Sequence, residues 1–153
     1  MVKYEIDMST LMIMSISENT TRIITIDDDF IVNDNSLSII DNSCRFFGNS
    51  LKERINVTKR LVNISSKSPI IVEESRCILF FPLKSTREKE NIWISYNNLD
   101  TYVKNDDKTI FRFKCGKVVE IKFSYYIIDN QVTRSLILDY EYNKRRKSRE
   151  LKK

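Results

Sequence analysis

Apolar positions in the first forty residues come in short runs that alternate with clusters of Asp and Asn. The runs are rich in β-branched and aromatic residues and poor in Gly and Pro, a composition typical of strands. Asp and Asn favour turns, so the clusters are read as the connections between strands. Four strands are predicted before residue 41: Lys3–Ile6, Leu11–Ile16, Thr21–Ile26 and Ser36–Ile40.

The periodicity changes after Gly48. Leu51, Ile55, Thr58 and Val62 recur at helical spacing, while Lys52, Lys59 and Arg60 lie away from that stripe. The run Asp41–Ser43 contains residues that can cap the start of a helix. We therefore predict a helix after Gly48 whose apolar stripe packs in the core.

Extended segments return after Pro69 and continue to about residue 123. The predicted strands are Ile70–Val72, the buried run Cys77–Phe81 that ends at Pro82, Ile92–Ile94, and a meander of Tyr102–Val103, Thr109–Lys114 and Val118–Phe123. Lys84–Asn91 is polar and is expected to form an exposed loop. Lys114–Lys117 is read as a hairpin turn in which Gly116 supplies a positive φ.

The last predicted element is a helix from about Ser124 to Arg146, because this stretch lacks Gly and Pro and keeps helical spacing. The tail Lys144–Lys153 is expected to be a frayed end. The whole pattern predicts one α+β domain over residues 1–143, followed by a basic tail over residues 144–153. Its sheet is mostly antiparallel, with a central helix after Gly48 and a C-terminal helix. A strongly curved sheet of this kind with one C-terminal helix is similar to small PH-like domains.

Charge is distributed unevenly along the chain. The net charge is −6 over residues 1–41, +6 over residues 42–87, −1 over residues 88–143 and +6 over residues 144–153. Two concentrated basic blocks indicate a polyanion such as nucleic acid as partner. The alternative is a solvated surface followed by a disordered tail.

The chemistry of the side chains argues against an enzyme. Histidine is absent, which excludes a His-based triad, and the sequence contains neither a P-loop nor a Rossmann glycine pattern. Three widely spaced cysteines without a CxxC motif predict reduced, mostly buried thiols in a cytoplasmic protein and no zinc site. Asp27–Asp29 fits a hairpin turn better than a cation site. No cofactor is expected, and the apolar run Leu11–Met14 is too short to span a membrane.

One segment, Ser43-Cys44-Arg45-Phe46-Phe47-Gly48, follows neither period. It lies within Asp41–Ser50, the first of a series of ordered motifs. The others are Lys67-Ser68-Pro69-Ile70, Leu79-Phe80-Phe81-Pro82 with Ser85-Thr86-Arg87, Trp93-Ile94-Ser95, Gly116-Lys117 with Glu120, Ser124-Tyr125, Asn130-Gln131-Val132 and Arg134. In this order and spacing, over about residues 37–138, the chain resembles the ComK family of bacterial competence transcription factors. Its length indicates a short member or a C-terminally trimmed form.

The resemblance implies a cytoplasmic, nucleoid-associated activator of DNA-uptake genes. It implies binding to A/T-rich boxes of double-stranded DNA, mainly through the minor groove, as a homodimer or higher oligomer. RNA polymerase and a proteolytic adaptor are further partners that the resemblance implies. It implies no binding to a membrane. The alternative function is a non-catalytic protein-interaction module, or a regulatory paralogue that pairs with a full-length competence factor.

Exposed cations are the candidate DNA contacts, because a narrow A-tract minor groove attracts Arg and Lys and phosphates bind both. The candidates are Arg45, Lys52, Arg54, Lys59, Arg60, Lys67, Lys84 and Arg87 in the middle block and Arg145, Arg146, Lys147 and Arg149 in the tail. Arg45 either enters the minor groove or positions the protein on it. Alternatively, it stabilises the fold through an ion pair with Asp41. Lys52 and Lys59 are equally consistent with plain solvated surface. Phe46 and Phe47 are expected in the core rather than as intercalating wedges.

Overall fold

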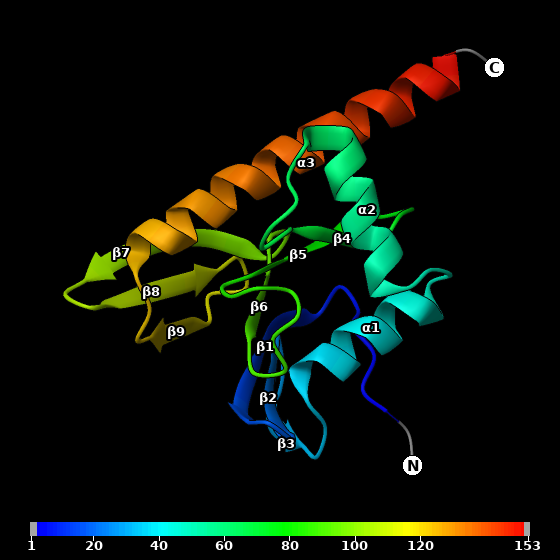
Figure 1. Cartoon of the computed structure of the whole chain (residues 1–153). Helices are drawn as coiled ribbons and strands as arrows, with labels where there is room; N and C mark the ends of the chain where they lie inside the picture. The colour runs from blue at the N-terminus through cyan, green and yellow to red at the C-terminus, as the bar shows by residue number, and fades with distance from the viewer. Residues whose placement is uncertain (1–2, 152–153) are drawn as a thin grey trace.

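The computed structural model describes residues 3–151, and within them the chain forms two antiparallel sheets and three helices (Figure 1). The elements are β1 (Thr10–Ser17), β2 (Thr20–Thr25), β3 (Asp29–Val32), α1 (Ser36–Phe46), α2 (Leu51–Val62), β4 (Ile70–Glu73), β5 (Ile78–Pro82), β6 (Ile92–Ser95), β7 (Leu99–Asn105), β8 (Lys108–Phe113), β9 (Val118–Ile121) and α3 (Tyr125–Leu151). The predicted α+β class with mainly antiparallel strands is confirmed.

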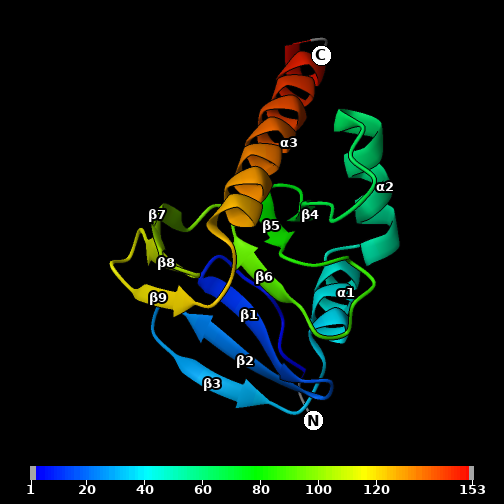
Figure 2. The same ribbon diagram turned by 60° about the vertical axis from the view of Figure 1, so that its left-hand side comes forward.

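The larger sheet has the strand order β3-β2-β1-β6-β5-β4, and the smaller has the order β7-β8-β9. The β1–β6 pair joins the N-terminal strands to the middle of the chain, with Met12 opposite Ile94 and Ile13 opposite Trp93. Successive residues of a strand point to opposite faces of the sheet, so the two pairs belong to different hydrophobic cores. Ile13 and Trp93 pack with α1 and α2, while Met12 and Ile94 pack with the smaller sheet and the start of α3 (Figure 2).

The large sheet is therefore covered on both faces, which explains the apolar run in β5. All five residues of that strand are buried. The predicted strands after residue 69 and the Lys84–Asn91 loop are confirmed in outline. Burial alternates along β8, where Phe111 and Phe113 are buried while Arg112 is exposed. Gly116 has the expected positive φ of 93° in the β8–β9 turn.

The prediction for residues 36–43 is wrong. Ser36–Ile40 is the start of α1 rather than a strand, and Asp41–Ser43 lies inside the helix rather than at its cap. The Asn35 side chain caps the helix by accepting a hydrogen bond from the Ser38 amide at 2.8 Å. The buried residues of α1 are Ser36, Ile39, Ile40, Ser43 and Cys44, a spacing that places them on one helical face. Lys3–Ile6, another predicted strand, has no regular secondary structure.

The unusual motif Ser43–Gly48 is the end of this helix. The amide of Gly48 donates to the carbonyl of Arg45 at 3.0 Å, and the amide of Asn49 donates to that of Cys44 at 3.2 Å. This pair of bonds is a Schellman motif, which needs a positive φ at its glycine, here 109°. Phe47 packs against the core as predicted, but Phe46 is 62% exposed, which corrects that prediction. The helix ends at Phe46, and its exposed ring packs edge to face on the ring of Phe47, with the centroids 5.1 Å apart.

Replacing Gly48 with alanine should destabilise the protein by about 1 kcal/mol. A Cβ at this position would meet no atom within 4 Å, so the cost comes from the backbone conformation alone. Chemical denaturation measures the change as a lower midpoint with an unchanged m-value. An unaltered midpoint would contradict the assignment of this glycine to the helix end.

The predicted helix after Gly48 is confirmed as α2, which begins after the N-cap residue Ser50. The C-terminal helix is also confirmed, but it continues to Leu151. The frayed end expected from Lys144 is thus helical as far as residue 151, while Lys152 and Lys153 lie outside the described residues. No helix in the described range is long and apolar enough to cross a bilayer.

The three cysteines are free thiols. Burial raises the pKa of Cys44 to about 12, and burial together with the nearby Asp139 carboxylate raises the pKa of Cys77 to about 12. Both therefore remain protonated apolar groups at neutral pH. Cys44 and Cys77 are buried, in line with the expectation of mostly buried cysteines, and Cys115 is exposed. Over residues 3–151 no three His, Cys, Asp or Glu side chains gather as ligands for a metal ion.

Candidate nucleic-acid interface

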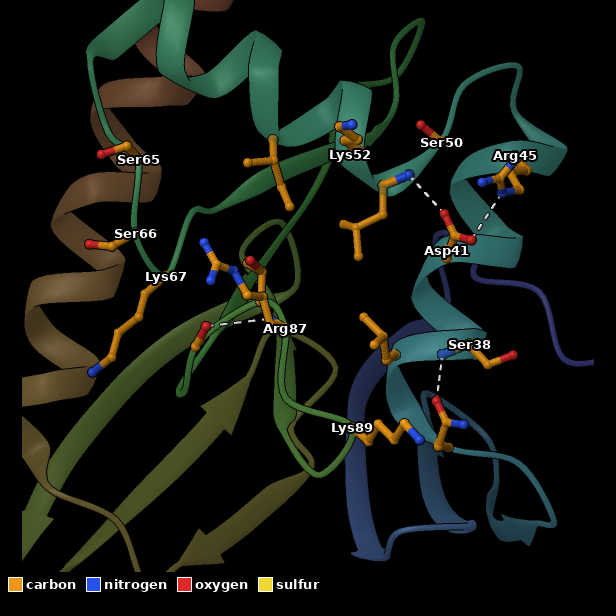
Figure 3. Close-up of a pocket in the computed structure, with 16 residues that line it drawn as sticks. Ser38, Asp41, Arg45, Ser50, Lys52, Ser65, Ser66, Lys67, Arg87 and Lys89 are labelled. Carbon is orange, nitrogen blue, oxygen red and sulfur yellow. Dashed lines mark hydrogen bonds and ion pairs between the residues drawn. The ribbon is translucent and has the colours of Figure 1, made fainter.

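A groove of about 890 Å³ lies between the two short helices and two loops (Figure 3). The N-terminal turn of α2 and most of α1 form one side, and the β5–β6 and α2–β4 loops form the other. Five of its sixteen lining residues are cationic and one is acidic. The lining residues are Asn35, Leu37, Ser38, Asp41, Arg45, Ser50, Leu51, Lys52, Ile55, Ser65, Ser66, Lys67, Ser85, Thr86, Arg87 and Lys89.

Four of the predicted contact residues meet in this groove although they come from four different segments. Arg45 is on α1, Lys52 on the first turn of α2, Lys67 before β4, and Arg87 in the β5–β6 loop. In Figure 3, Arg87 and Lys89 lie on the β5–β6 loop, while Lys52 and Arg45 lie on the two helices. The folding of the chain therefore turns a basic stretch of sequence into a basic concave surface.

Most of the other predicted cations are exposed but lie outside the groove. Lys84 is exposed in the β5–β6 loop, and Lys59 and Arg60 are exposed near the C-terminal end of α2. The tail candidates sit on the last turns of α3, where Arg145, Lys147 and Arg149 are exposed and Arg146 is half-buried. Arg146 also donates to the backbone carbonyl of Glu74 at 3.4 Å.

Arg54 is a structural residue rather than an exposed contact, which corrects its place among the candidates. Its side chain is 3% exposed, and its Nη1 donates to the Glu74 carboxylate at 2.6 Å. Its Nη2 donates to the Phe47 carbonyl at 3.3 Å. The residue lies on the apolar face of α2 with Leu51 and Thr58, so its charge points into the fold instead of toward a ligand.

Arg45 forms the ion pair that was one of its two predicted roles. Its Nε donates to Oδ2 of Asp41 at 2.9 Å, one helical turn earlier. The side chain nevertheless remains 63% exposed and lines the groove. An exposed pair of this kind contributes about 0–1 kcal/mol, so the bond does not prevent Arg45 from contacting a phosphate as well.

Sequence reasoning missed Lys89 and the two helix N-termini. Lys89 stands between Glu88 and Glu90, so this three-residue segment has a net charge of −1 and lies outside both basic blocks. Its Nζ lies 3.4 Å from Glu18, with both side chains about 60% exposed. α1 and α2 both begin at the groove, at Asn35 and Ser50, and helix N-termini carry partial positive charge. The Asn-x-x-Ser and Ser-x-x-Glu capping patterns were the sequence signals for these starts.

The β5–β6 loop is held in place by a buried asparagine. Asn91 is 1% exposed, and its side chain donates to the carbonyls of Lys84 and Ser85 while accepting from the amides of Lys84 and Ile92, at 2.8–3.2 Å. Further along the loop, the hydroxyl of Ser36 donates to the carbonyl of Lys89 at 2.9 Å. The loop cations are therefore carried on a backbone tied to β6 and to α1.

The opposite loop is tied to the C-terminal helix. Gln131 is buried, and its Nε2 donates to the carbonyl of Lys67 at 2.8 Å and to that of Pro82 at 2.7 Å. Arg134 donates to Gln131 Oε1 at 2.8 Å and to the Lys67 carbonyl at 3.3 Å. α3 thus contributes no lining residue but fixes the backbone that carries Lys67.

The sequence of the chain is similar to that of known proteins. A family model described as ComK protein matches residues 1–147. The competence transcription factor of Bacillus subtilis (strain 168) is 33% identical over 82 residues, which are 53% of this chain and 43% of that protein. The chain thus matches less than half the length of that relative. No solved structure matches significantly. Because the family model covers nearly the whole sequence, this chain belongs to the ComK protein family.

Proposed function

We propose that this chain binds double-stranded DNA through the basic groove and acts as a transcription activator of competence genes. The single observation that carries the proposal is the convergence of Arg45, Lys52, Lys67, Arg87 and Lys89 on one surface with a single carboxylate. Such a surface neutralises phosphates and steers a polyanion toward it. The family assignment supports the same role, and the relative is named a competence transcription factor.

In this proposal the preferred ligand is an A/T-rich box read mainly through the minor groove. A narrow A-tract groove has an enhanced negative potential, which favours an inserted Arg without a base-specific hydrogen-bond code. Arg45 is the candidate for insertion because it is 63% exposed at the edge of the groove. Lys52, Lys67, Arg87 and Lys89 would contact phosphates, and Lys59, Arg60 and Lys84 would extend the contact beyond the groove.

The remaining parts of the chain have secondary roles in the proposal. Residues 1–143 form a non-catalytic DNA-binding domain, and residues 144–153 provide an additional basic arm. The protein acts in the cytoplasm, at the nucleoid, as an oligomer on paired boxes. RNA polymerase and a proteolytic adaptor are the further partners that membership of the family suggests.

A gel-shift assay with an A/T-box duplex tests the proposal. Retention at low salt is expected, with competition by a minor-groove ligand, and the logarithm of affinity should fall linearly with the logarithm of salt concentration. Arg45→Ala should weaken binding to the A/T box about tenfold, if one inserted Arg contributes on the order of 1–2 kcal/mol. The absence of any shift at low salt on this duplex would overturn DNA binding by this chain alone.

Protein interaction is the second candidate function, and one observation favours it. The outer face of α3 exposes Leu136, Ile137 and Tyr140, at 55%, 46% and 64%. Apolar side chains adjacent on an exposed helix are typical of a surface that contacts another protein. Sedimentation of the chain with and without the duplex separates the two functions: association that is independent of DNA, in a chain that gives no gel shift, would favour the interaction module.

A further inference from the structure

Asp41 is the one carboxylate among the groove-lining residues, which also include five cationic side chains. A negative charge in this position repels phosphate and lowers the affinity for any duplex. Asp41 is also in the middle of α1, where a neutral residue would fit the helix equally well. Its effect on binding therefore depends on what the carboxylate contacts.

The two oxygens of Asp41 have different partners. Oδ1 accepts the backbone amide of Leu51, the first residue of α2, at 2.9 Å. Oδ2 accepts Nε of Arg45, also at 2.9 Å. The two terminal nitrogens of that guanidinium make no hydrogen bond to any residue of the described chain, so they remain available at the edge of the groove.

This arrangement restrains a long side chain while leaving its tip free. Arginine loses considerable rotamer freedom on binding, and a residue already restrained loses less. A restrained arginine also fits a narrow minor groove better than it fits the phosphates of a mixed-sequence duplex, whose geometry is variable. The carboxylate would consequently lower the affinity for every duplex, but it would lower the affinity less for the duplex into which Arg45 inserts.

We propose that Asp41 is a positioning residue that holds Arg45 for insertion and thereby raises the preference for A/T-rich over mixed-sequence DNA. This inference rests on the proposed DNA binding. It assigns specificity to an acidic side chain that itself makes no favourable contact with DNA.

Asp41→Asn is the most informative variant because its amide oxygen can still accept the Leu51 amide, which keeps α1 and α2 in contact. Affinities for an A/T-box duplex and a mixed-sequence duplex of equal length are measured at one salt concentration. Binding to the mixed duplex should tighten about threefold, and the preference for the A/T box should fall about threefold. In an Arg45→Ala background the same substitution should still tighten binding but should leave the preference unchanged.

Two further variants separate positioning from charge and from stability. Glu88→Gln removes one negative charge from the exposed β5–β6 loop outside the groove lining, and should leave the preference unchanged. Asp41→Glu keeps the charge but displaces it, so the preference should fall without tighter binding to the mixed duplex. Thermal unfolding of each variant checks that the fold is retained.

The outcomes distinguish this inference from the function on which it rests. A wild-type chain that binds neither duplex overturns both. A wild-type chain that prefers the A/T box, with Asp41→Asn shifting both affinities by the same factor, overturns only the role of Asp41. An equal fall in preference with and without Arg45 also overturns it, because the carboxylate would then not act through that residue.

Discussion

Replacing Lys52, Lys67 and Arg87 together by glutamine is expected to weaken binding to an A/T-box duplex on the order of 100-fold at low salt. These three cations lie in the groove on three different segments and are the proposed phosphate contacts. Removing one phosphate-binding cation should reduce the steepness of the salt dependence by about 0.9. Gel-shift titrations at four or five salt concentrations measure both the affinity and this slope.

Matched variants distinguish the groove from the net charge of the protein. Lys108→Gln and Arg112→Gln on the exposed side of β8, together with Lys122→Gln directly after β9, remove the same charge outside the groove. This triple variant should change the affinity by less than about fivefold, since distant surface charges are screened. Equal losses of affinity in the two triple variants would contradict the groove as the binding surface.

A third triple variant tests the basic end of α3. The combined variant Arg145→Gln, Lys147→Gln and Arg149→Gln removes three exposed cations that do not line the groove. If these residues provide an additional arm, affinity should fall by about tenfold with no change in the preference for the A/T box. An unchanged affinity would show that the tail is not part of the interface.

The largest effect on stability is expected from Asn91→Leu. The substitution leaves two backbone amides and two carbonyls at the base of the β5–β6 loop without the partners they have in the native protein. Buried polar groups without partners are costly, and we expect the free energy of unfolding to fall by on the order of 3 kcal/mol. For a chain of this length that corresponds to a fall in Tm of about 6–12 °C. Calorimetry or circular dichroism measures the shift.

Asn56→Ala is the matched control, since Asn56 is exposed on α2. Its effect should stay within about 0.5 kcal/mol. Where Asn91→Leu remains folded, the loosened loop should also weaken DNA binding, because Arg87 and Lys89 depend on that backbone. A Tm shift no larger than that of the control would contradict the role of Asn91 in holding the loop.

The strands were predictable wherever burial on one or both faces leaves a clear pattern. β5 is a short apolar run ended by Pro82, and β8 is rich in β-branched and aromatic residues with Arg112 between two phenylalanines, so both could be recognised from the sequence. α1 was missed although its buried residues have helical spacing. The adjacent Ile39 and Ile40 are β-branched and suit a strand equally well, so local propensity was ambiguous there. Packing against the sheet decided in favour of the helix.

The candidate site was only partly predictable, and Arg54 shows why. It belongs to the same basic stretch as Lys52, two residues earlier, yet its side chain is 3% exposed while Lys52 is on the surface. The helical stripe of Leu51, Ile55 and Thr58 was visible in the sequence. Arg54 lies beside this stripe, but only its hydrogen bonds to Glu74 and Phe47 make it a buried structural residue.

The sequence by itself determined the α+β class, the helix after Gly48 and the two segments with excess positive charge, because these follow from local periodicity and composition, and its ordered motifs carried the resemblance to the family. The tertiary structure decided which of those charges share a surface. Arg45, Lys67 and Arg87 are far apart along the chain and line one groove because α1, α2 and two loops pack on the same face of the large sheet. This arrangement depends on side-chain hydrogen bonds to the backbone, made by Asn91 within its loop, by Asp41 to the start of α2 and by Gln131 to Lys67, which lies 64 positions earlier in the chain.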